Sequence, residues 1–460
     1  MSRRRARPTR SSLGMRLRAA IPPAAAVVLV LIAALLPYPR LLDRSQDTVA
    51  VSRTAYACPS GSTAAAGQIA AASAVTATEL PKAARVKALE STDTWRRAKL
   101  DRTTVVDQVG RGSGAVGFFS MVGNIGEGEG LMVGSCPATL DESWFVGLGS
   151  GVKHESRLVI TNVSDVVAVA DVTMWGTEGE IEVVGGDGLV LKPEETRTIP
   201  VSDFAAGEAE LAVRVERRRG AFAVTALDAS TRSYSGSEAA PPTNAPHRTQ
   251  LLSGFPANAK FRSLLITNPT TTTSRVSVEV IGPKGSFAPR GLESVRATAG
   301  RVTSVELPTT VGSDAIAVRL TSEQPILATA RVSENKSDYA YAAAERPLDG
   351  AAIVPVALAG GVGRPRLTLT APGKAASVTV QGFDASMRPL KSAKFEINAG
   401  TTAIVNVGQA LDSDRLAYAV VTPHGRVMGA ATFRSDDGIA SVPLEGAPVR
   451  VLGPDVQVVG

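Results

Sequence analysis

Histidine and cysteine are scarce in this chain, which has 3 and 2 of them among 460 residues. His154, His247 and His424 have no second ligand or acid at a useful spacing, so each is expected to be an exposed loop residue. Neither a Gly-x-Ser-x-Gly motif nor a metalloprotease helix motif occurs. These gaps predict a protein without catalytic residues, cofactors or metal ions, and the chain is not expected to be an enzyme.

Aromatic residues are also few, at 4% of the chain, whereas 43 residues are glycine. This composition favours many short strands and turns over large aromatic pockets. The hydrophobic content of 44% is nevertheless ample for packed cores.

Acidic residues are nearly absent from the first 44 positions, where nine arginines accompany a single acid, Asp43. This local balance of +8 exceeds the net charge of the whole chain, +6, so the remainder is near −2. The basic isoelectric point is therefore not the footprint of a nucleic-acid partner, and no such partner is expected.

An apolar run at residues 19–36 follows seven of these arginines. A helix of this length spans roughly 27 Å, which is enough to cross a bilayer. The arginine bias predicts a single-pass signal anchor in the cell membrane, with a cytoplasmic amino terminus and an extracellular remainder. A cleaved signal peptide is the alternative, but the nearest small-residue site, at residues 55–57, lies about twenty residues too far along.

Both cysteines follow this segment, and each stands between a small residue and a proline, in Ala57-Cys58-Pro59 and Ser135-Cys136-Pro137. An even number of cysteines in an oxidising compartment predicts one disulfide, Cys58 to Cys136. Two unpaired small hydrophobic residues are the alternative.

One short stretch recurs three times at intervals of about a hundred residues. The copies are Leu158-Val159-Ile160-Thr161-Asn162, Leu264-Leu265-Ile266-Thr267-Asn268-Pro269 and Leu367-Thr368-Leu369-Thr370-Ala371-Pro372. The apolar residues alternate with period two, which predicts an entry strand with one face in a core and the other outward. Asn or Pro then ends the strand, and Asn does so by capping a turn with its side chain.

Each copy is followed by further strand signals and by a predicted closing hairpin. In the first unit the two arms of that hairpin are residues 211–215 and 222–227, and a copy of the second arm also occurs earlier, at 115–121. Short strands at this spacing predict an all-β fold of tandem immunoglobulin-like or fibronectin-III-like sandwiches. A β-propeller is the alternative, but the period shows no half-repeat.

The predicted organisation has seven parts. They are a cytoplasmic basic tail (1–18), the transmembrane signal anchor (19–39), a linker (40–60), a degenerate first β domain (61–140) and three β-sandwich repeats (141–245, 246–350 and 351–460). An alanine-rich stretch at 64–77 fits a linker or a loose helix. The glycines at 112–117 formally match a dinucleotide fingerprint, but residues 118–122 predict a strand where that motif needs a helix.

Two groups of residues are candidates for ligand contact. Trp144 and Trp175 are the first, because sugar-binding sites use exposed aromatic platforms; packing in a core is the alternative. The second is the run Arg217, Arg218 and Arg219 at a predicted hairpin tip, where an anionic wall polymer or lipid headgroup would bind; a solvated turn is the alternative.

The arginine-led anchor, the two cysteine settings, residues 171–176 (DVTMWG), residues 199–204 (IPVSDF) and the three entry strands together resemble an uncharacterised family. It is an actinobacterial family of membrane-anchored, secreted-side proteins, a domain of unknown function. The resemblance covers about residues 55–460 and implies no activity or functional residues.

The expected function is that of a non-catalytic cell-envelope scaffold or interaction protein on the outer face of the membrane. Its partners would be the membrane, through the amino-terminal helix, and an envelope protein or glycan. The alternative is a carbohydrate-binding or cell-wall polymer assembly accessory protein that uses the Trp144 and Trp175 regions.

Overall fold

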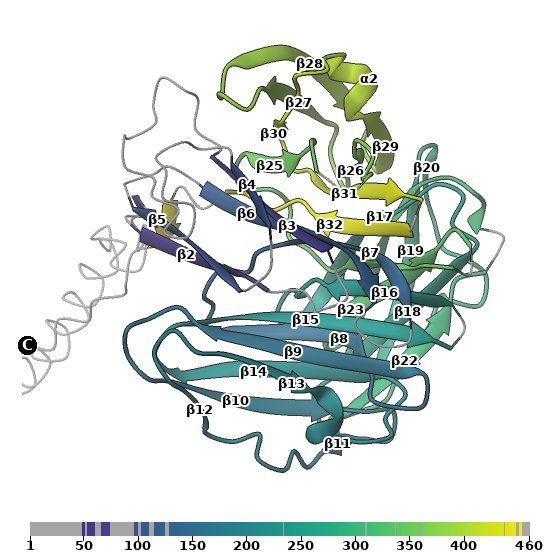
Figure 1. Cartoon of the computed structure of the whole chain (residues 1–460). Coiled ribbons are helices and arrows are strands. Elements are labelled where there is room, and N and C mark those ends of the chain that lie inside the picture. The colour runs from purple at the N-terminus through teal and green to yellow at the C-terminus, as the bar shows by residue number, and fades with distance from the viewer. Residues whose placement is uncertain are drawn as a thin grey trace, which may run out of the picture. The chain divides into compact units, whose positions relative to one another are not determined.

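The computed structural model describes residues 48–50, 53–59, 66–73, 96–99, 103–109, 115–124, 128–232, 234–308, 311–335, 337–358, 361–436, 438–447 and 450–452. Strands dominate, and the helical elements of this part are η1 (Val201–Asp203) and α2 (Val407–Leu411). The all-β prediction is confirmed, and the described sheets do not close into a propeller (Figure 1). The predicted tail and anchor, residues 1–39, lie outside these ranges. None of the helices within them has the length and apolar character needed to cross a bilayer.

Residues Ala50–Val451 form one compact unit, in which three pairs of sheets follow one another. We call these pairs the first, second and third sandwiches. In the first, the sheet β11-β10-β14-β8, with β12 beside β10, shares a core with the sheet β13-β9-β15-β16. Its strands are β8 (Glu142–Leu148), β9 (His154–Asn162), β10 (Ala168–Trp175), β11 (Glu180–Ile181), β12 (Leu189–Leu191), β13 (Thr196–Pro200), β14 (Leu211–Arg219), β15 (Phe222–Thr231) and β16 (Ser235–Ala240).

The other two sandwiches repeat this strand order. The strands of the second are β17 (His247–Phe255), β18 (Phe261–Asn268), β19 (Ser274–Gly282), β20 (Gly285–Phe287), β21 (Val295–Ala297), β22 (Arg301–Glu306), β23 (Ile316–Ser333) and β24 (Ala340–Ala343). The strands of the third are β25 (Ala352–Pro355), β26 (Arg366–Ala371), β27 (Ala376–Phe383), β28 (Pro389–Ile397), β29 (Thr401–Asn406), β30 (Tyr418–His424), β31 (Met428–Ser435) and β32 (Gly438–Pro443).

A leading sheet precedes them, with the order β4-β3-β6-β7. The strands of this region are β1 (Thr48–Ala50), β2 (Arg53–Cys58), β3 (Ala66–Ser73), β4 (Arg96–Lys99), β5 (Thr104–Val109), β6 (Ala115–Asn124) and β7 (Glu129–Ser135), and β33 (Arg450–Leu452) comes last in the chain. The alanine-rich stretch predicted as a linker or helix contains strand β3, because pairing with β6 outweighs the local preference of alanine. The domain boundaries drawn from the sequence remain predictions.

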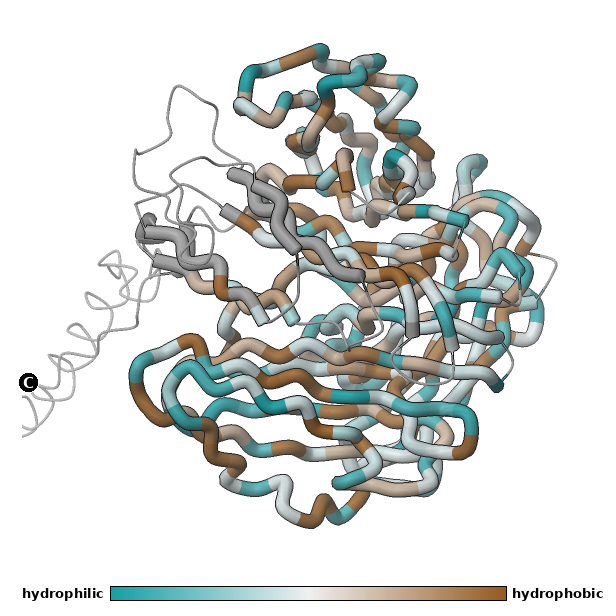
Figure 2. The backbone as a smooth tube through the Cα atoms, viewed as in Figure 1, coloured by the Kyte–Doolittle hydropathy of each residue, from teal (hydrophilic) through white to brown (hydrophobic). Residues whose placement is uncertain are grey.

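The entry strands β9, β18 and β26 have their predicted apolar face in the sandwich cores. Leu158, Leu264 and Leu367, for example, are fully buried. The prediction that the other face points to solvent is wrong, because Val159 and Leu265 are buried too. Val159 packs on residues of the leading sheet, and Leu265 packs on the first sandwich. Both faces of these sheets therefore take part in packing, and Figure 2 shows the hydrophobic positions recurring along the strands.

The predicted closing hairpins are also wrong, because their two arms belong to different sheets. Strand β14 pairs with β8 and β10, whereas β15 pairs with β9 and β16. In the second sandwich both arms form one 18-residue strand, β23, whose first part pairs with β17 and β19 and whose second part pairs with β18 and β24. A strand that changes sheets makes a corner of a sandwich. Among the consecutive strands that do form hairpins are β15–β16, β23–β24, β31–β32 and β6–β7.

The turn-capping role predicted for asparagine is confirmed. The amide of Asn268 donates to the carbonyl oxygens of Thr272 and Ala297 at 2.9 and 3.0 Å, and its oxygen accepts the Thr270 backbone N–H at 3.1 Å. Asn162 makes the equivalent contacts in the first sandwich. Each buried side chain thereby satisfies backbone groups that the end of a strand leaves open.

Candidate functional site

Asp228, on β15, is fully buried, and its carboxylate joins two sandwiches. Within the first sandwich it accepts hydrogen bonds from His154 Nε2, at 2.9 Å, and from the Ser156 hydroxyl. From the second sandwich it accepts the hydroxyl groups of Tyr339 and Tyr341, at 2.7 and 2.6 Å. Four donors thus surround one carboxylate where the two sandwiches meet.

Arg331, on β23, crosses the same contact in the opposite direction. Its guanidinium group makes two hydrogen bonds, of 2.9 and 2.8 Å, to the two carboxylate oxygens of Glu210 in the first sandwich. It also donates to the Tyr341 hydroxyl at 3.1 Å and to the backbone oxygen of Gly147. A two-pronged pair of this kind is among the strongest polar contacts in proteins, and it sets the relative position of its two partners.

We call Asp228, its donors His154, Ser156, Tyr339 and Tyr341, and the Arg331–Glu210 pair the Asp228 cluster. The charged groups of this cluster contact one another inside the protein. Burial alone would raise the pKa of Asp228, but His154 and Arg331 hold that pKa well below its usual range. Burial raises the pKa of Tyr339 and Tyr341 well above the ordinary phenol value, so both remain neutral donors. The Asp228 carboxylate is therefore surrounded by hydrogen-bond donors, and the guanidinium group of Arg331 also holds the carboxylate of Glu210.

The geometry of the cluster does not form a nucleophile relay. Ser156 donates to Asp228 and accepts the backbone N–H of Gly149 at 2.7 Å. His154 uses Nε2 on Asp228 and lies with Nδ1 3.0 Å from the backbone oxygen of Ala209. A Ser–His relay needs the hydroxyl on the imidazole, and here both side chains are engaged elsewhere.

His154 also borders a polar surface depression of about 270 Å³, but its ring nitrogens face into the cluster. Across the described ranges, no three His, Cys, Asp or Glu side chains gather as metal ligands do. We therefore interpret the cluster as a junction between sandwiches.

The tryptophan pair lies at the same junction. Trp144 on β8 and Trp175 on β10 stack with ring centroids 5.4 Å apart, and only 6% and 5% of their surface is exposed. Leu265, Val302 and Leu327 of the second sandwich cover them. This arrangement is the core-packing alternative, and it offers no open aromatic face. Ligand contact by these two residues remains a prediction.

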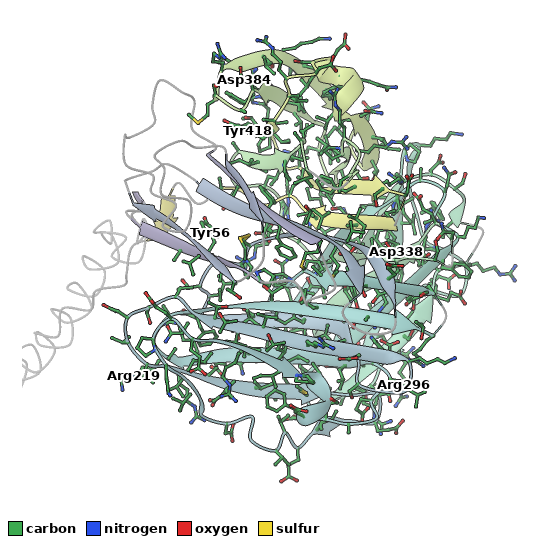
Figure 3. The ribbon with its side chains drawn as sticks, viewed as in Figure 1. Tyr56, Arg219, Arg296, Asp338, Asp384 and Tyr418 are labelled. Atoms are coloured by element: carbon green, nitrogen blue, oxygen red, sulfur yellow. A yellow bond between two sulfur atoms is a disulfide. The ribbon has the colours of Figure 1, made fainter. Side chains whose placement is uncertain are left out.

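The three arginines lie at the exposed end of β14, and Figure 3 shows Arg219 at the edge of the first sandwich. Arg217 pairs with Asp141, and Arg218 pairs with Asp171, both through short ion pairs. Two of the three charges are therefore already balanced at the surface, where such pairs contribute little to stability. Binding of an anionic ligand by this run also remains a prediction.

Comparison with known protein families shows to which family the chain belongs. The sequence model described as a family of unknown function, DUF5719, matches residues 96–408. The chain belongs to this family. No curated protein matches it. The DUF5719 match begins at β4 and includes both sandwiches that build the Asp228 cluster, and it ends within α2 of the third sandwich.

Sequence reasoning missed the main polar site of this DUF5719 protein. His154 was expected to be exposed, and that prediction is wrong, because the side chain is buried beside Asp228. His247 and His424 are exposed as predicted, but each is an end residue of a strand, β17 or β30, and not part of a loop. The cluster partners lie 74 and 177 residues from His154 along the chain, so no local spacing could have pointed to them.

A second polar junction lies where the last hairpins of the sandwiches meet. Asp338, just before β24, accepts the backbone N–H groups of Leu131 on β7 and Ile439 on β32, at 3.2 and 2.8 Å (Figure 3). Its carboxylate occupies space left by glycine, because a Cβ atom added at Gly236 or Gly438 would overlap it. One acid thereby ties three β-hairpins together.

Glu238 on β16 belongs to this second junction, which we call the Asp338 junction. The side chain is fully buried; one carboxylate oxygen accepts the Ala239 backbone N–H at 2.8 Å, and the other has no hydrogen-bond partner among the described residues. Burial, with Asp338 nearby, raises the pKa of Glu238 well above its usual range. At this junction Glu238 therefore lies close to a second acid, Asp338.

The predicted disulfide between Cys58 and Cys136 is confirmed, with Cα atoms 4.5 Å apart. It connects β2 to the residue that follows β7, and Gly117 on β6 packs directly against it. Because the bridge closes a separation of 78 residues, the chain-entropy model assigns it about 4 kcal/mol of stabilisation. The disulfide ties β2 to the leading sheet, and its cysteines pack in an apolar cluster with Val159 and Leu227 of the first sandwich.

Proposed function

We propose that this DUF5719 protein is a non-catalytic scaffold or interaction protein of the cell envelope. The observation that carries the proposal is the Asp228 cluster. Its acid, imidazole, hydroxyl and guanidinium groups bond one another across two sandwiches. Residues used in this way hold surfaces in place, and edges and loops are left for partners.

The proposed place is the outer face of the membrane, with residues 19–39 as the anchor. Two features support it. Arginines precede the apolar run and bias the amino terminus to the inside, and the Cys58–Cys136 disulfide is typical of an oxidising compartment. A fixed ectodomain behind such an anchor would present its exposed loops to envelope proteins or glycans.

The test is photo-crosslinking in intact cells with the full-length protein. A crosslinking amino acid replaces Arg219 at the exposed end of β14, and a control replaces Val184, which is 77% exposed in a different loop. Capture of one envelope protein from the Arg219 position, and not from Val184, is the expected result. Capture of a wall glycan alone would favour the carbohydrate-binding alternative, and equal, diffuse labelling from both positions would contradict a specific surface at Arg219.

The location has its own test. Protease added to intact cells should cleave the chain within residues after 39 and leave the amino-terminal tail protected. Protection of the whole chain until the membrane is opened would contradict the proposed orientation.

A further inference from the structure

A groove of about 810 Å³ lies where the sandwiches are connected to one another. Three segments form it. They are residues 244–251, which lead from β16 into β17, residues 345–348, which lead from β24 towards β25, and the turn 425–426 between β30 and β31. We call it the Arg346 groove. Its volume is within the range of pockets that bind ligands, and it is open to solvent, so a ligand can reach its lining.

Backbone hydrogen bonds between the three segments fix the walls of the groove. The Glu345 N–H donates to the carbonyl oxygen of Leu251 at 2.9 Å, and the Leu348 N–H donates to that of Val427 at 2.7 Å. The walls are therefore held in place before a ligand arrives. Preorganisation of this kind lowers the entropic cost of binding.

Two arginine side chains line the groove, Arg346 and Arg426, and both are exposed. The Leu348–Val427 hydrogen bond places their two segments side by side. Neither guanidinium group has an acid partner or a hydrogen bond among the described residues, whereas Arg217 at the end of β14 is paired with an acid. Like charges on adjoining segments repel each other, and an anion bound between them would offset that repulsion.

The acid in this lining, Glu345, does not balance the two arginines. Both of its carboxylate oxygens are buried. Burial, with Glu445 nearby, raises the pKa of Glu345 well above its usual range, so this side chain holds its proton more readily than an exposed glutamate does. The Arg346 groove therefore presents positive charge to the solvent.

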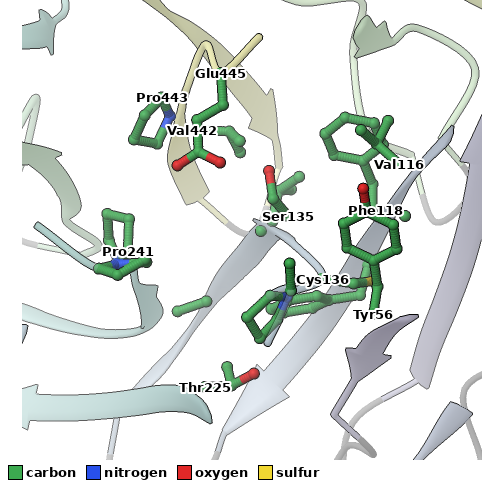
Figure 4. Close-up of a pocket in the computed structure, with 18 of the residues that line it drawn as sticks. Tyr56, Val116, Phe118, Ser135, Cys136, Thr225, Pro241, Val442, Pro443 and Glu445 are labelled. Carbon is green, nitrogen blue, oxygen red and sulfur yellow. The ribbon is translucent and has the colours of Figure 1, made fainter. Parts of the chain in front are cut away.

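A second pocket, of about 220 Å³, lies beside the disulfide and has a different lining (Figure 4). Its walls include Val116, Phe118 and Val442, and its charged side chain is that of Glu445. Among the residues that the structure describes, no arginine or lysine lines it. Of the two sites, the Arg346 groove is therefore the one that attracts an anion.

The floor of the Arg346 groove selects among anionic ligands. Pro246, Leu251, Pro347 and Leu348 contribute apolar surface, and no described phenylalanine, tyrosine or tryptophan lines the groove. Sugar-binding surfaces typically use such rings, so an acidic glycan fits this floor less well. An extended peptide directs successive side chains to opposite sides, so it can place apolar side chains on the floor and carboxylates at the rim.

We propose that the Arg346 groove binds an extended acidic peptide segment of a partner protein. The carboxylates of that segment pair with Arg346 and Arg426, because a guanidinium group matches the geometry of a carboxylate. This inference rests on the interaction function proposed above, and it names the chemical class of the partner segment. The two can fail separately, because the groove is tested with purified protein and the interaction function is tested by crosslinking from Arg219 in cells.

The first test is selection from a random peptide library on the immobilised full-length protein in a neutral detergent. Acidic residues should be more frequent in the selected peptides than in the starting library. The double variant Arg346→Gln/Arg426→Gln should lose this enrichment. The matched control is Arg248→Gln, which removes the same charge from an exposed neighbour that does not line the groove, and the enrichment should remain.

Fluorescence polarisation then compares one selected peptide with a copy in which each acid is replaced by its amide. Arg346→Gln and Arg426→Gln should each weaken binding of the acidic peptide about fivefold, which is at the upper end of the effect of an exposed ion pair. Neither variant should change the affinity for the amide copy. Added salt should weaken binding of the acidic peptide by screening. Circular dichroism confirms the fold of each variant before titration.

Three results would overturn the proposal. The first is a selection on folded wild-type protein without enrichment of acidic residues. The second is an equal loss of affinity in Arg248→Gln and Arg346→Gln, which would mean general attraction to a positive surface. The third is binding of trigalacturonate, an acidic sugar, without binding of acidic peptides, which would assign the groove to a glycan. A failed selection together with capture of one envelope protein from Arg219 would overturn the groove alone and leave the proposed interaction function in place.

Discussion

Asp228 and Glu238 lie directly opposite each other on the β15–β16 hairpin, and both are fully buried, yet their charges are treated in opposite ways. Asp228 is surrounded by His154, Arg331 and hydroxyl donors, and its pKa falls well below the usual range. Glu238 has Asp338 as its neighbour, and its pKa rises well above it. Burial is the same at both positions, so the identity of the partners decides whether a buried acid carries charge.

The comparison extends to the two junctions. The Asp228 cluster joins two sandwiches with a carboxylate and a guanidinium that depend on each other. The Asp338 junction joins hairpins with acids, backbone N–H groups and the space that glycine leaves. Removing a cation at the Asp228 cluster should therefore lower the stability of the protein. At the Asp338 junction, a side chain larger than glycine should lower it.

The largest expected effect is that of Arg331→Met. It leaves the buried Asp228 with His154 but without the guanidinium group, and it leaves the half-buried Glu210 with only the longer pair to Arg232, at 3.7 Å. We expect a loss of about 3 kcal/mol in the free energy of unfolding.

The matched control is Arg157→Met on β9, whose pair with Glu155 lies within one strand, is about one-third exposed and should contribute less than about 1 kcal/mol. Denaturant unfolding at pH 7 measures both; similar losses for the two variants would show that the cluster does not join the sandwiches.

The next effect tests the second junction. Gly438→Ala places a methyl group where the Asp338 carboxylate lies, and overpacking of this kind costs about 1–3 kcal/mol. Gly179→Ala is the matched control, because Gly179 has nearly the same φ as Gly438, 156° against 158°, and a Cβ atom there meets nothing within 4 Å. The same unfolding measurement compares the two, and a neutral Gly438→Ala would mean that Asp338 has room to move.

Asp228→Asn should destabilise the protein by about 2 kcal/mol at pH 7, because hydrogen bonds to a charged acceptor are replaced by weaker or mismatched ones. The folded-state pKa of Asp228 is lowered, so its contribution is complete above the unfolded value of about 3.8 and is lost as the pH falls further. The difference between variant and wild type should be constant from pH 8 to pH 5 and narrow below pH 4. A difference that widens on acidification would contradict the assigned charge.

Glu238→Gln should have the smallest effect and the opposite sign. The folded-state pKa of Glu238 is raised, so the wild-type protein loses stability as the pH rises above the unfolded value of about 4.5. The neutral glutamine avoids that loss and should stabilise the protein by about 1 kcal/mol at pH 7, with no advantage below pH 4.5. Thermal unfolding across pH 4 to 8 checks this, and destabilisation at pH 7 would show that the charged form is favoured after all.

Local signals account for much of the fold. Alternation of apolar residues located β9, β18 and β26, and the asparagine at the end of two of them formed the predicted turns. Long-range signals were absent. Nothing near the alanine-rich stretch showed that β3 would pair with β6, and nothing near residue 211 showed that β14 and β15 would enter different sheets.

The candidate sites show the same limit. The cysteine pair was predictable because only two cysteines exist. His154 and the partners of Asp228 were not, because residues separated by 72 to 113 positions contribute to a single carboxylate site. The pocket beside the disulfide likewise has walls from β6, β16 and β32, which are far apart in the chain.

The sequence by itself determined the β class of the chain, the strand periodicity, the turn caps and the disulfide, since each depends on residues close together or on a pair with no competitor. Only the tertiary structure decided which apolar faces meet a neighbouring sandwich, which buried acids carry charge and where a cavity remains. The physical reason is that burial, pKa and cavity volume are set by partners in space, and a single alternating strand such as residues 264–268 has the same pattern whether its second face meets solvent or another sheet.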